Sequence, residues 1–341
     1  MPGAHLQTVW PLLLRGGIAL PDYRRERMET PDGDFIDLDW VAGRNPAPVM
    51  PAPRAFGTSP WPPRATTDLD DKTPLVVLFH GLEGSSHSHY ARALMHAVAA
   101  RGWHGVVVHF RGCSGEPNRL PRAYHSGDSA EIAWVLDALG RRYAELFAVG
   151  VSLGGNALLK YLGEHGTRAR PQTAAAISVP YDLAAANGML SRGIGRLYSR
   201  HFLRSLIPGA LAKAQRFPGH AGYTQPEAIR RARTLRDFDQ AVTAPLHGFA
   251  GADDYYARSS SAQYLGGITV PTLLLHAIND PFLPASAIPA AKRLPGCVEL
   301  ELSYAGGHVG FVSGRLPGHL DWLPQRVLGH LGQSARNNRV A

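Results

Sequence analysis

Runs of consecutive apolar residues alternate along the chain with segments whose apolar residues recur every three or four positions. The apolar runs lie in "TPLVVLFHG" (73–81), "HGVVVHF" (104–110), "ELFAVGV" (145–151), "AAAISV" (174–179) and "PTLLLHA" (271–277). Helical spacing is found in "SHYARALMHAVAARG" (88–102), in "SGDSAEIAWVLDALG" (126–140) and after Ser152. Because strands made only of apolar residues are buried on both faces, this order predicts an α/β fold with a mostly parallel central sheet and helices on both faces.

Alternating patterns indicate further strands near the two ends of the chain. The segment "RMETPDGDFIDLDWV" (27–41) predicts two short strands around a turn at Pro31-Asp32-Gly33, which would form a hairpin at one edge of the sheet. The segment "VELELSYAGG" (298–307) predicts the last strand, and the helical "DWLPQRVLGHL" (321–331) follows it.

Two segments interrupt the alternation of strands and helices. Residues 43–72 are dense in proline and small residues that cannot pair in a sheet, so we expect an exposed surface loop. Residues 183–265 are too long for a simple crossover and have a helical pattern, which predicts a helical cap or lid insertion. We therefore interpret residues 1–341 as a single domain with one cap.

Composition and charge narrow the class of protein. The chain has 341 residues, of which 45% are hydrophobic and 18% charged, enough to bury a large core. Lys and Arg (35) exceed Asp and Glu (27), but no nucleic-acid motif or long basic run is present, so we expect no nucleic-acid partner. The sequence has only two cysteines, and we find in it no secretory signal and no apolar stretch of ~20 residues. We therefore expect a cytoplasmic protein.

A single serine stands at one junction between a strand and a helix. Residues 150–154, "GVSLG", fit the G-x-S-x-G turn, in which the central side chain points outward because the flanking glycines permit close approach. Serine and glycine are also ordinary turn residues, so the pattern alone is weak. The buried strand before it and the helix after it favour Ser152 as a nucleophile.

A serine nucleophile needs a base, and the base needs a group that orients it. In an open α/β sheet these groups converge at the carboxyl ends of the strands. Asp280 follows the apolar run in "PTLLLHAIND", and His308 follows the last strand in "YAGGH". The order Ser152, Asp280, His308 is that of the α/β-hydrolase triad. Asp253 and Asp254 are the alternative acids, but no apolar strand precedes them, so we expect them on a cap or at a helix start.

Two backbone amides are candidates for stabilising an oxyanion. Such donors come from the residue after the nucleophile and from the loop after an early strand, which here are Leu153 and Leu82. The nearby His80, His87 and His89 could instead bind zinc, but their spacing matches no known metal motif. We therefore predict no metal and no cofactor.

The sequence resembles the YheT-like α/β-hydrolases, which are related to the abhydrolase-domain esterases and lipases. The resemblance spans nearly the whole chain, and residues 43–72 look like a local elaboration. The matching segments are "HLQTVWP", "LFHGLEGSSHSHYARAL", "FRGCSGEPNRLPRAYHSGDSAEI", "GVSLGGNALLKYLGE", "FDQAVTAPLHGFAGADDYY", "LLLHAINDPFLP" and "AGGHVGF". This resemblance implies short-chain carboxylesterase or monoacylglycerol-lipase-like activity, with Ser152, Asp280 and His308 at the positions of the triad.

These observations predict a serine hydrolase that cleaves a small-molecule or lipid ester through an acyl-enzyme. A catalytically idle hydrolase fold that binds a lipid or a protein, or a thioesterase or amidase on the same triad, are the alternatives. The sequence does not predict the oligomeric state.

Contact with a membrane surface is a further possibility, because the expected cap has one stripe of basic residues. Arg192, Arg196, Arg200 and Arg204 recur every fourth residue beside Leu197, Leu203 and Leu206. Such a stripe is more often the solvated face of an ordinary helix than a lipid-binding surface, and we favour the solvated face.

Overall fold

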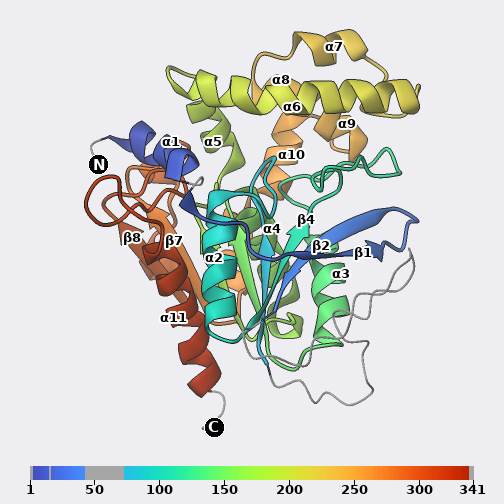
Figure 1. The fold of residues 1–341 in the computed structure, drawn as a ribbon. Coiled ribbons are helices and arrows are strands. Elements are labelled where there is room, and N and C mark those ends of the chain that lie inside the picture. The colour runs from blue at the N-terminus through green and yellow to red at the C-terminus, as the bar shows by residue number, and fades with distance from the viewer. Residues whose placement is uncertain (1–2, 15–16, 43–72, 338–341) are drawn as a thin grey trace.

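One eight-stranded sheet organises the molecule (Figure 1). The computed structural model describes residues 3–14, 17–42 and 73–337, so the predicted loop at 43–72 lies outside the described residues. The strand order is β1-β2-β4-β3-β5-β6-β7-β8. The strands are β1 (Arg24–Glu29), β2 (Phe35–Val41), β3 (Leu75–Phe79), β4 (His104–His109), β5 (Leu146–Val151), β6 (Thr173–Ile177), β7 (Thr272–Ala277) and β8 (Val298–Ser303).

Strands β3 to β8 pair in parallel, whereas β2 pairs antiparallel with both β1 and β4. The predicted hairpin is therefore present at the sheet edge, although β1 begins three residues before the predicted start. These findings confirm the predicted mostly parallel central sheet.

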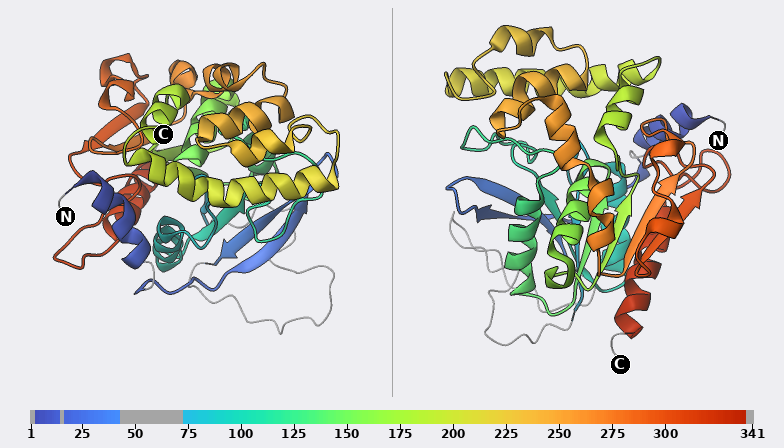
Figure 2. Two further views of the ribbon diagram at one scale, coloured as in Figure 1. Left: turned by 90° about the horizontal axis from the view of Figure 1, so that it is seen from above. Right: turned by 180° about the vertical axis from the view of Figure 1, so that it is seen from behind.

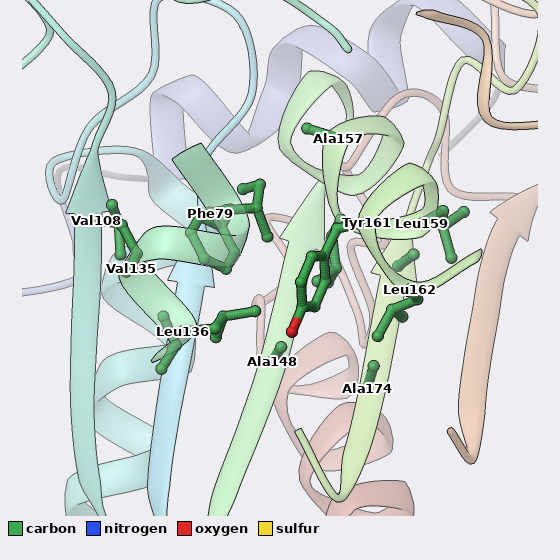
Figure 3. Close-up of a cluster of buried hydrophobic side chains, with 14 of the residues drawn as sticks. Phe79, Val108, Val135, Leu136, Ala148, Ala157, Leu159, Tyr161, Leu162 and Ala174 are labelled. Atoms are coloured by element: carbon green, nitrogen blue, oxygen red, sulfur yellow. The ribbon is translucent and has the colours of Figure 1, made fainter. Parts of the chain in front are cut away.

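Helices cover both faces of the sheet. On one face lie α2 (His89–Ala100) and α11 (Trp322–Asn337), whose side chains pack with Val76, Leu78 and Val149. On the other face lie α3 (Ser129–Gly140) and α4 (Leu153–His165), which pack on Phe79 and Val108 (Figure 3). Because β3 to β6 are buried on both faces, their consecutive apolar residues contribute to two hydrophobic clusters at once.

Helix α3 begins at Ser129, so the expectation of a helix from about Ser126 was wrong by three residues. Arg122 binds the carboxylate of Asp128 at 2.6 Å, and Asp128 makes no side-chain cap bond to the helix. Gly127 lies so close to Ser259 that a Cβ would fall 2.4 Å from its Oγ. These contacts hold residues 126–128 as a turn against the helix that ends at Ser259.

A second helical layer lies above the carboxyl ends of the strands (Figures 1 and 2). It follows β6 and consists of α5 (Leu183–Leu190), α6 (Gly195–Arg216), α7 (Pro226–Arg231), α8 (Leu235–Phe238), η3 (Asp239–Thr243) and α9 (Ala244–Leu246). Its apolar residues form a cluster of their own, which includes Leu203, Ile229 and Phe238. The interpretation of residues 183–265 as a cap stays a prediction.

The last part of that segment returns to the body of the domain. It comprises α10 (Ala252–Ser259) and η4 (Ser261–Gly267). Asn156 of α4 donates to the Ser259 carbonyl at 2.7 Å and accepts from the Ser261 amide at 2.9 Å. Asp253 and Asp254 lie in the first turn of α10, at the kind of position expected for them.

A short N-terminal helix, α1 (Ala4–Leu14), lies at the same end of the molecule as α5 and the start of α6 (Figures 1 and 2). The remaining elements are the 3-10 turns η2 (Gly166–Arg168), η5 (Ala285–Ala287) and η6 (Ala291–Arg293).

Candidate active site

Ser152 lies in a tight turn between β5 and α4. Its backbone has φ 53° and ψ −118°, a conformation that side-chain-bearing residues rarely adopt. The turn passes so close to β3 that a Cβ on Gly154 would lie 2.4 Å from the Phe79 carbonyl oxygen. Glycine is therefore required there, and the strained turn lifts the Ser152 side chain out of the sheet at the carboxyl end of β5.

The structure brings His308 and Asp280 to Ser152, although the three lie far apart in the sequence. His308 Nε2 lies 3.0 Å from Ser152 Oγ, and His308 Nδ1 lies 2.9 Å from Asp280 Oδ2. The Phe282 amide donates to Asp280 Oδ1 at 2.8 Å, which fixes the other carboxylate oxygen. Because Asp280 accepts from Nδ1–H, Nε2 of the neutral imidazole is an acceptor for the Ser152 hydroxyl.

Helix α1 holds the loop that carries His308. Thr8 Oγ1 accepts from the His308 amide at 2.9 Å, and Gln7 Oε1 accepts from the Gly306 amide at 2.7 Å. Asn279 donates to the same Gln7 oxygen at 3.0 Å and accepts from the Gly307 amide at 3.0 Å. Reasoning from individual residues missed these contacts, and the only signal was the segment "HLQTVWP" among those that carried the family resemblance.

The loop after β3 lies directly against Ser152. A Cβ on Gly81 would be 3.2 Å from the Ser152 Cβ, a tight contact that Ser152 would have to shift slightly to relieve. The Gly81 amide donates to the Tyr90 hydroxyl at 2.9 Å, and the Glu83 amide donates to the Tyr124 hydroxyl at 2.8 Å. Leu82 lies between these two tethered amides.

Leu153 directly follows the candidate nucleophile, and Leu82 directly follows Gly81, which lies against Ser152. Within the described residues, neither backbone amide donates a hydrogen bond that would occupy it. Two such N–H groups beside a serine can stabilise a negatively charged oxygen. The tyrosines that hold the Leu82 loop were not predicted, because their contacts join residues nine and 41 positions apart.

His80 helps to fix the same loop, and both of its ring nitrogens have polar partners. The Phe110 amide donates to its Nε2 at 3.1 Å, and its Nδ1 lies 2.7 Å from the Gly81 carbonyl oxygen. Complete burial lowers the pKa of His80 to about 3, so the ring is neutral at pH 7. Across residues 3–14, 17–42 and 73–337, no three His, Cys, Asp or Glu side chains are grouped so that they could hold a metal ion.

A second buried histidine lies behind the acid. His276 Nε2 is 3.7 Å from Asp280 Oδ2, and burial lowers the pKa of His276 to about 4. The Tyr181 ring lies 5.8 Å from the His276 ring. His276 is therefore neutral at pH 7, and the Asp280 carboxylate faces it without a competing positive charge.

A cavity of about 620 Å³ opens beside the two candidate amides. Leu82 and Leu153 form part of its wall, and most of the rest comes from the loop after β4, helices α6, α8 and α9, and the turn η3. Most of the wall is apolar and includes Leu206, Phe238 and Val242. His125 and His247 add a polar region, and their ring centroids lie 4.3 Å apart.

The family profile of the α/β hydrolase fold matches residues 74–314, more than two thirds of the chain. The chain belongs to the α/β-hydrolase family. This α/β-hydrolase is 40% identical to the protein named "Putative esterase YheT" of Escherichia coli (strain K12), over 95% of this chain and 88% of that protein. The predicted resemblance to the YheT-like hydrolases is therefore confirmed.

Other relatives of this α/β-hydrolase carry the names of lipases. It is 31% identical to phospholipase ABHD3 of Mus musculus, over 92% of this chain and 74% of that protein. It is also 31% identical to a monoacylglycerol lipase of Saccharomyces cerevisiae, over 75% of this chain and 58% of the yeast protein. Family and relatives together support a hydrolase of ester substrates.

Solved esterase structures share the fold of this α/β-hydrolase. Est1E from Butyrivibrio proteoclasticus aligns with a TM-score of 0.54 at 13% identity, over 92% of this chain and 99% of Est1E. The esterase EaEST from Exiguobacterium antarcticum aligns with a TM-score of 0.55 at 15% identity, over 91% of this chain and 100% of EaEST. Among the described helices, none has the length and apolar character that crossing a bilayer requires.

Proposed function

We propose that the protein is a serine hydrolase that cleaves carboxylic esters through an acyl-enzyme on Ser152. The observation that carries this proposal is the continuous chain of contacts from Ser152 Oγ to His308 Nε2 at 3.0 Å and from His308 Nδ1 to Asp280 at 2.9 Å. Serine alone is a weak nucleophile, and an adjacent oriented imidazole is the arrangement that activates it. The esterase and lipase relatives support the same chemistry.

In this mechanism, Ser152 Oγ attacks the ester carbonyl carbon while its proton passes to His308 Nε2. Asp280 holds the imidazole in the required tautomer and stabilises its protonated form. The carbonyl oxygen gains negative charge and accepts hydrogen bonds from the Leu82 and Leu153 amides, each typically contributing ~3 kcal/mol of transition-state stabilisation.

The tetrahedral intermediate then collapses, and the bond to the leaving oxygen breaks. His308 gives its proton to that oxygen, and the alcohol departs. Water, deprotonated by His308, attacks the acyl-enzyme next and releases the carboxylic acid with Ser152 restored.

The cavity supports an ester with an apolar substituent. Leu82 and Leu153 contribute both to the proposed oxyanion site and to the cavity wall, so a carbonyl bound at the amides has one side facing the cavity. A volume of about 620 Å³ is in the ordinary range for sites that bind small organic molecules. A short-chain ester or a monoacylglycerol is the substrate class that we propose.

Replacing the proposed nucleophile tests the function. We expect Ser152→Ala to reduce kcat for p-nitrophenyl butyrate by a factor on the order of 10⁶, because the remaining residues cannot form an acyl-enzyme. Thermal unfolding of the variant checks that the fold is intact, and Ser191→Ala, a half-buried serine outside the site, is the matched control. Activity retained by a folded Ser152→Ala protein would exclude Ser152 as the nucleophile.

A further inference from the structure

One end of the molecule exposes several large apolar side chains on neighbouring helices. On α1, Leu6, Val9, Leu12 and Leu13 are exposed, and at 3.6 residues per turn they project from one side of the helix. The opposite side of α1 carries the buried Gln7 and faces the loop of His308. Beside α1, the end of α5 and the start of α6 expose Met189, Ile194 and Leu197. We call these seven residues, with the arginines described next, the docking face.

The charges of this region are all of one sign. Residues 183–226 contain no Asp or Glu but six Lys and Arg residues. Arg192, Arg196, Arg200 and Arg204 among them are exposed. None of these four pairs with a carboxylate in the described part of the chain, whereas exposed Arg170, Arg236 and Arg258 each pair with an aspartate.

The structure corrects part of the predicted basic stripe. Arg196, Arg200 and Arg204 lie on α6 as expected, but Arg192 lies in the turn before the helix. Leu203 is buried and Leu206 lines the cavity, so only Leu197 of the three expected leucines is exposed beside the arginines. The apolar part of the docking face comes mainly from α1, which the sequence pattern did not place near α6.

We propose that the docking face binds the surface of a membrane that contains anionic lipids. Exposed leucines on short helices can enter the boundary between headgroups and acyl chains, and unpaired arginines can contact lipid phosphates. A second copy of the chain is a poorer occupant, because a symmetric contact would bring two sets of unpaired arginines together. A protein surface of mixed charge would also leave some of these arginines without a partner.

The docking face adjoins the proposed active site through a short series of ring contacts. The His5 ring of α1 lies 5.8 Å from the Tyr198 ring of α6, and the Tyr198 ring lies 4.8 Å from that of Phe282. Phe282 in turn stacks on His308 at 4.0 Å. A lipid surface on this face would therefore lie near the proposed triad, although binding itself does not depend on catalysis.

Cosedimentation with vesicles tests the proposal on the full chain. We expect the protein to pellet with equimolar phosphatidylglycerol and phosphatidylcholine vesicles at low salt, more strongly than with pure phosphatidylcholine vesicles. Replacing Arg192, Arg196, Arg200 and Arg204 by Gln should lower the partition coefficient about ten-fold or more, because each basic residue near an anionic surface contributes to binding. Leu13→Gln with Leu197→Gln should also weaken binding, since these side chains are 70% and 60% exposed and would lose their contact with lipid.

A matched control removes the same number of charges at the other end of the sheet. Arg141, Arg168, Lys292 and Arg293 are exposed, and they follow the ends of α3 and α4 or precede β8. Their replacement by Gln should leave vesicle binding nearly unchanged. Ser152→Ala should bind like the wild type, which separates this proposal from the proposed hydrolysis.

Three results would overturn the proposal. The first is equal binding of the wild type to anionic and neutral vesicles. The second is an equal loss of binding in the two four-residue charge variants. The third is a wild-type dimer without lipid that the two Leu replacements dissociate, because a second copy would then cover the apolar residues.

Discussion

At the scale of single residues, backbone geometry and short side chains create the candidate site. Ser152 has a positive φ because the strand turns directly into a helix, and Gly81 permits the neighbouring loop to contact it. Thr8 contributes one hydroxyl that binds the amide of His308 at 2.9 Å. The position of the His308 ring thus depends on a residue 300 positions earlier in the chain.

We expect Thr8→Val to reduce kcat with little change in KM for a small ester. Valine has a similar shape but cannot accept the hydrogen bond from the His308 amide, so the loop would shift and the imidazole would lose its alignment with Ser152. Small misalignments of catalytic groups can cost up to about 100-fold in rate. Steady-state kinetics with p-nitrophenyl butyrate provide the measurement.

Thr8→Ser is the control, because it keeps the hydroxyl and should retain most of the activity. Equal losses in the Val and Ser variants would show that the methyl group, and not the hydrogen bond, is what matters at this position. A change in KM alone would contradict the positioning role.

At the scale of elements, a hydrogen-bonded network around the buried Asp39 attaches the β1–β2 hairpin to the rest of the sheet. Asp39 of β2 binds Arg25 of β1 at 2.7 Å and His109 of β4 at 2.9 Å. Ser86, just after the Leu82 loop, donates to the same carboxylate at 2.6 Å. Burial raises the pKa of Asp39, but hydrogen bonds from His109, Arg25 and Ser86 outweigh it and hold the pKa well below its usual range.

Asp39→Asn should therefore destabilise the protein by on the order of 2–3 kcal/mol at neutral pH, because it leaves Arg25 and the buried His109 and Ser86 without their negatively charged partner. A carboxyl group whose pKa is lower in the folded protein than in the unfolded chain stabilises the fold at pH values above its unfolded-state pKa of about 4. This stabilisation is lost as the pH falls toward the folded-state pKa. The difference in unfolding free energy between wild type and variant should thus shrink below about pH 4. Denaturant unfolding at several pH values measures it.

The control is Asp137→Asn, whose partly exposed pair with Arg170 should contribute less than about 1 kcal/mol. A difference between wild type and Asp39→Asn that is constant from neutral to acid pH would contradict this role for the Asp39 charge.

The elements that could be predicted from the sequence are those whose formation depends on the local pattern of apolar and polar residues. The apolar runs predicted β3 to β7 because strands buried on both faces carry no polar alternation. The start of α3 was misplaced because contacts from Arg122 and Ser259 decide it, and these are tertiary. Helix α1 was not predicted at all, because Pro11 and its mixed polarity hide its helical pattern.

In the candidate site, too, local pattern could be predicted and tertiary contacts could not. The proximity of Ser152, Asp280 and His308 could be predicted because each lies in the loop or turn that follows a recognisable strand, and strand ends meet at one edge of a parallel sheet. Tyr90, which supports the Leu82 loop, could not be predicted, because its contact depends on how a helix packs beside that loop.

At the scale of the whole molecule, the helical layer after β6 forms one side of the cavity wall. Helix α6 contributes Leu206 to the cavity wall, while Leu197 on the same helix is exposed. The width of the cavity is therefore set by packing between α6 and the domain body. This arrangement predicts that substrate size is controlled from the helical layer.

Leu206→Trp should reduce kcat/KM for p-nitrophenyl octanoate by about ten-fold or more and leave the acetate ester nearly unaffected, because a larger side chain fills space that only a long acyl chain needs. Leu197→Trp is the matched control on the exposed side of α6. If Leu206→Trp lowered activity equally for both esters, the cavity would not be the acyl-binding site.

The central claim is that Ser152 forms a covalent intermediate because His308 activates it, and covalent labelling followed by mass spectrometry tests it most directly. The wild-type protein should react with a fluorophosphonate, and the adduct should lie on the peptide that contains Ser152. His308→Gln should react far more slowly, although its serine is intact. An unlabelled wild-type protein, an adduct on another residue, or undiminished labelling of His308→Gln would contradict the account.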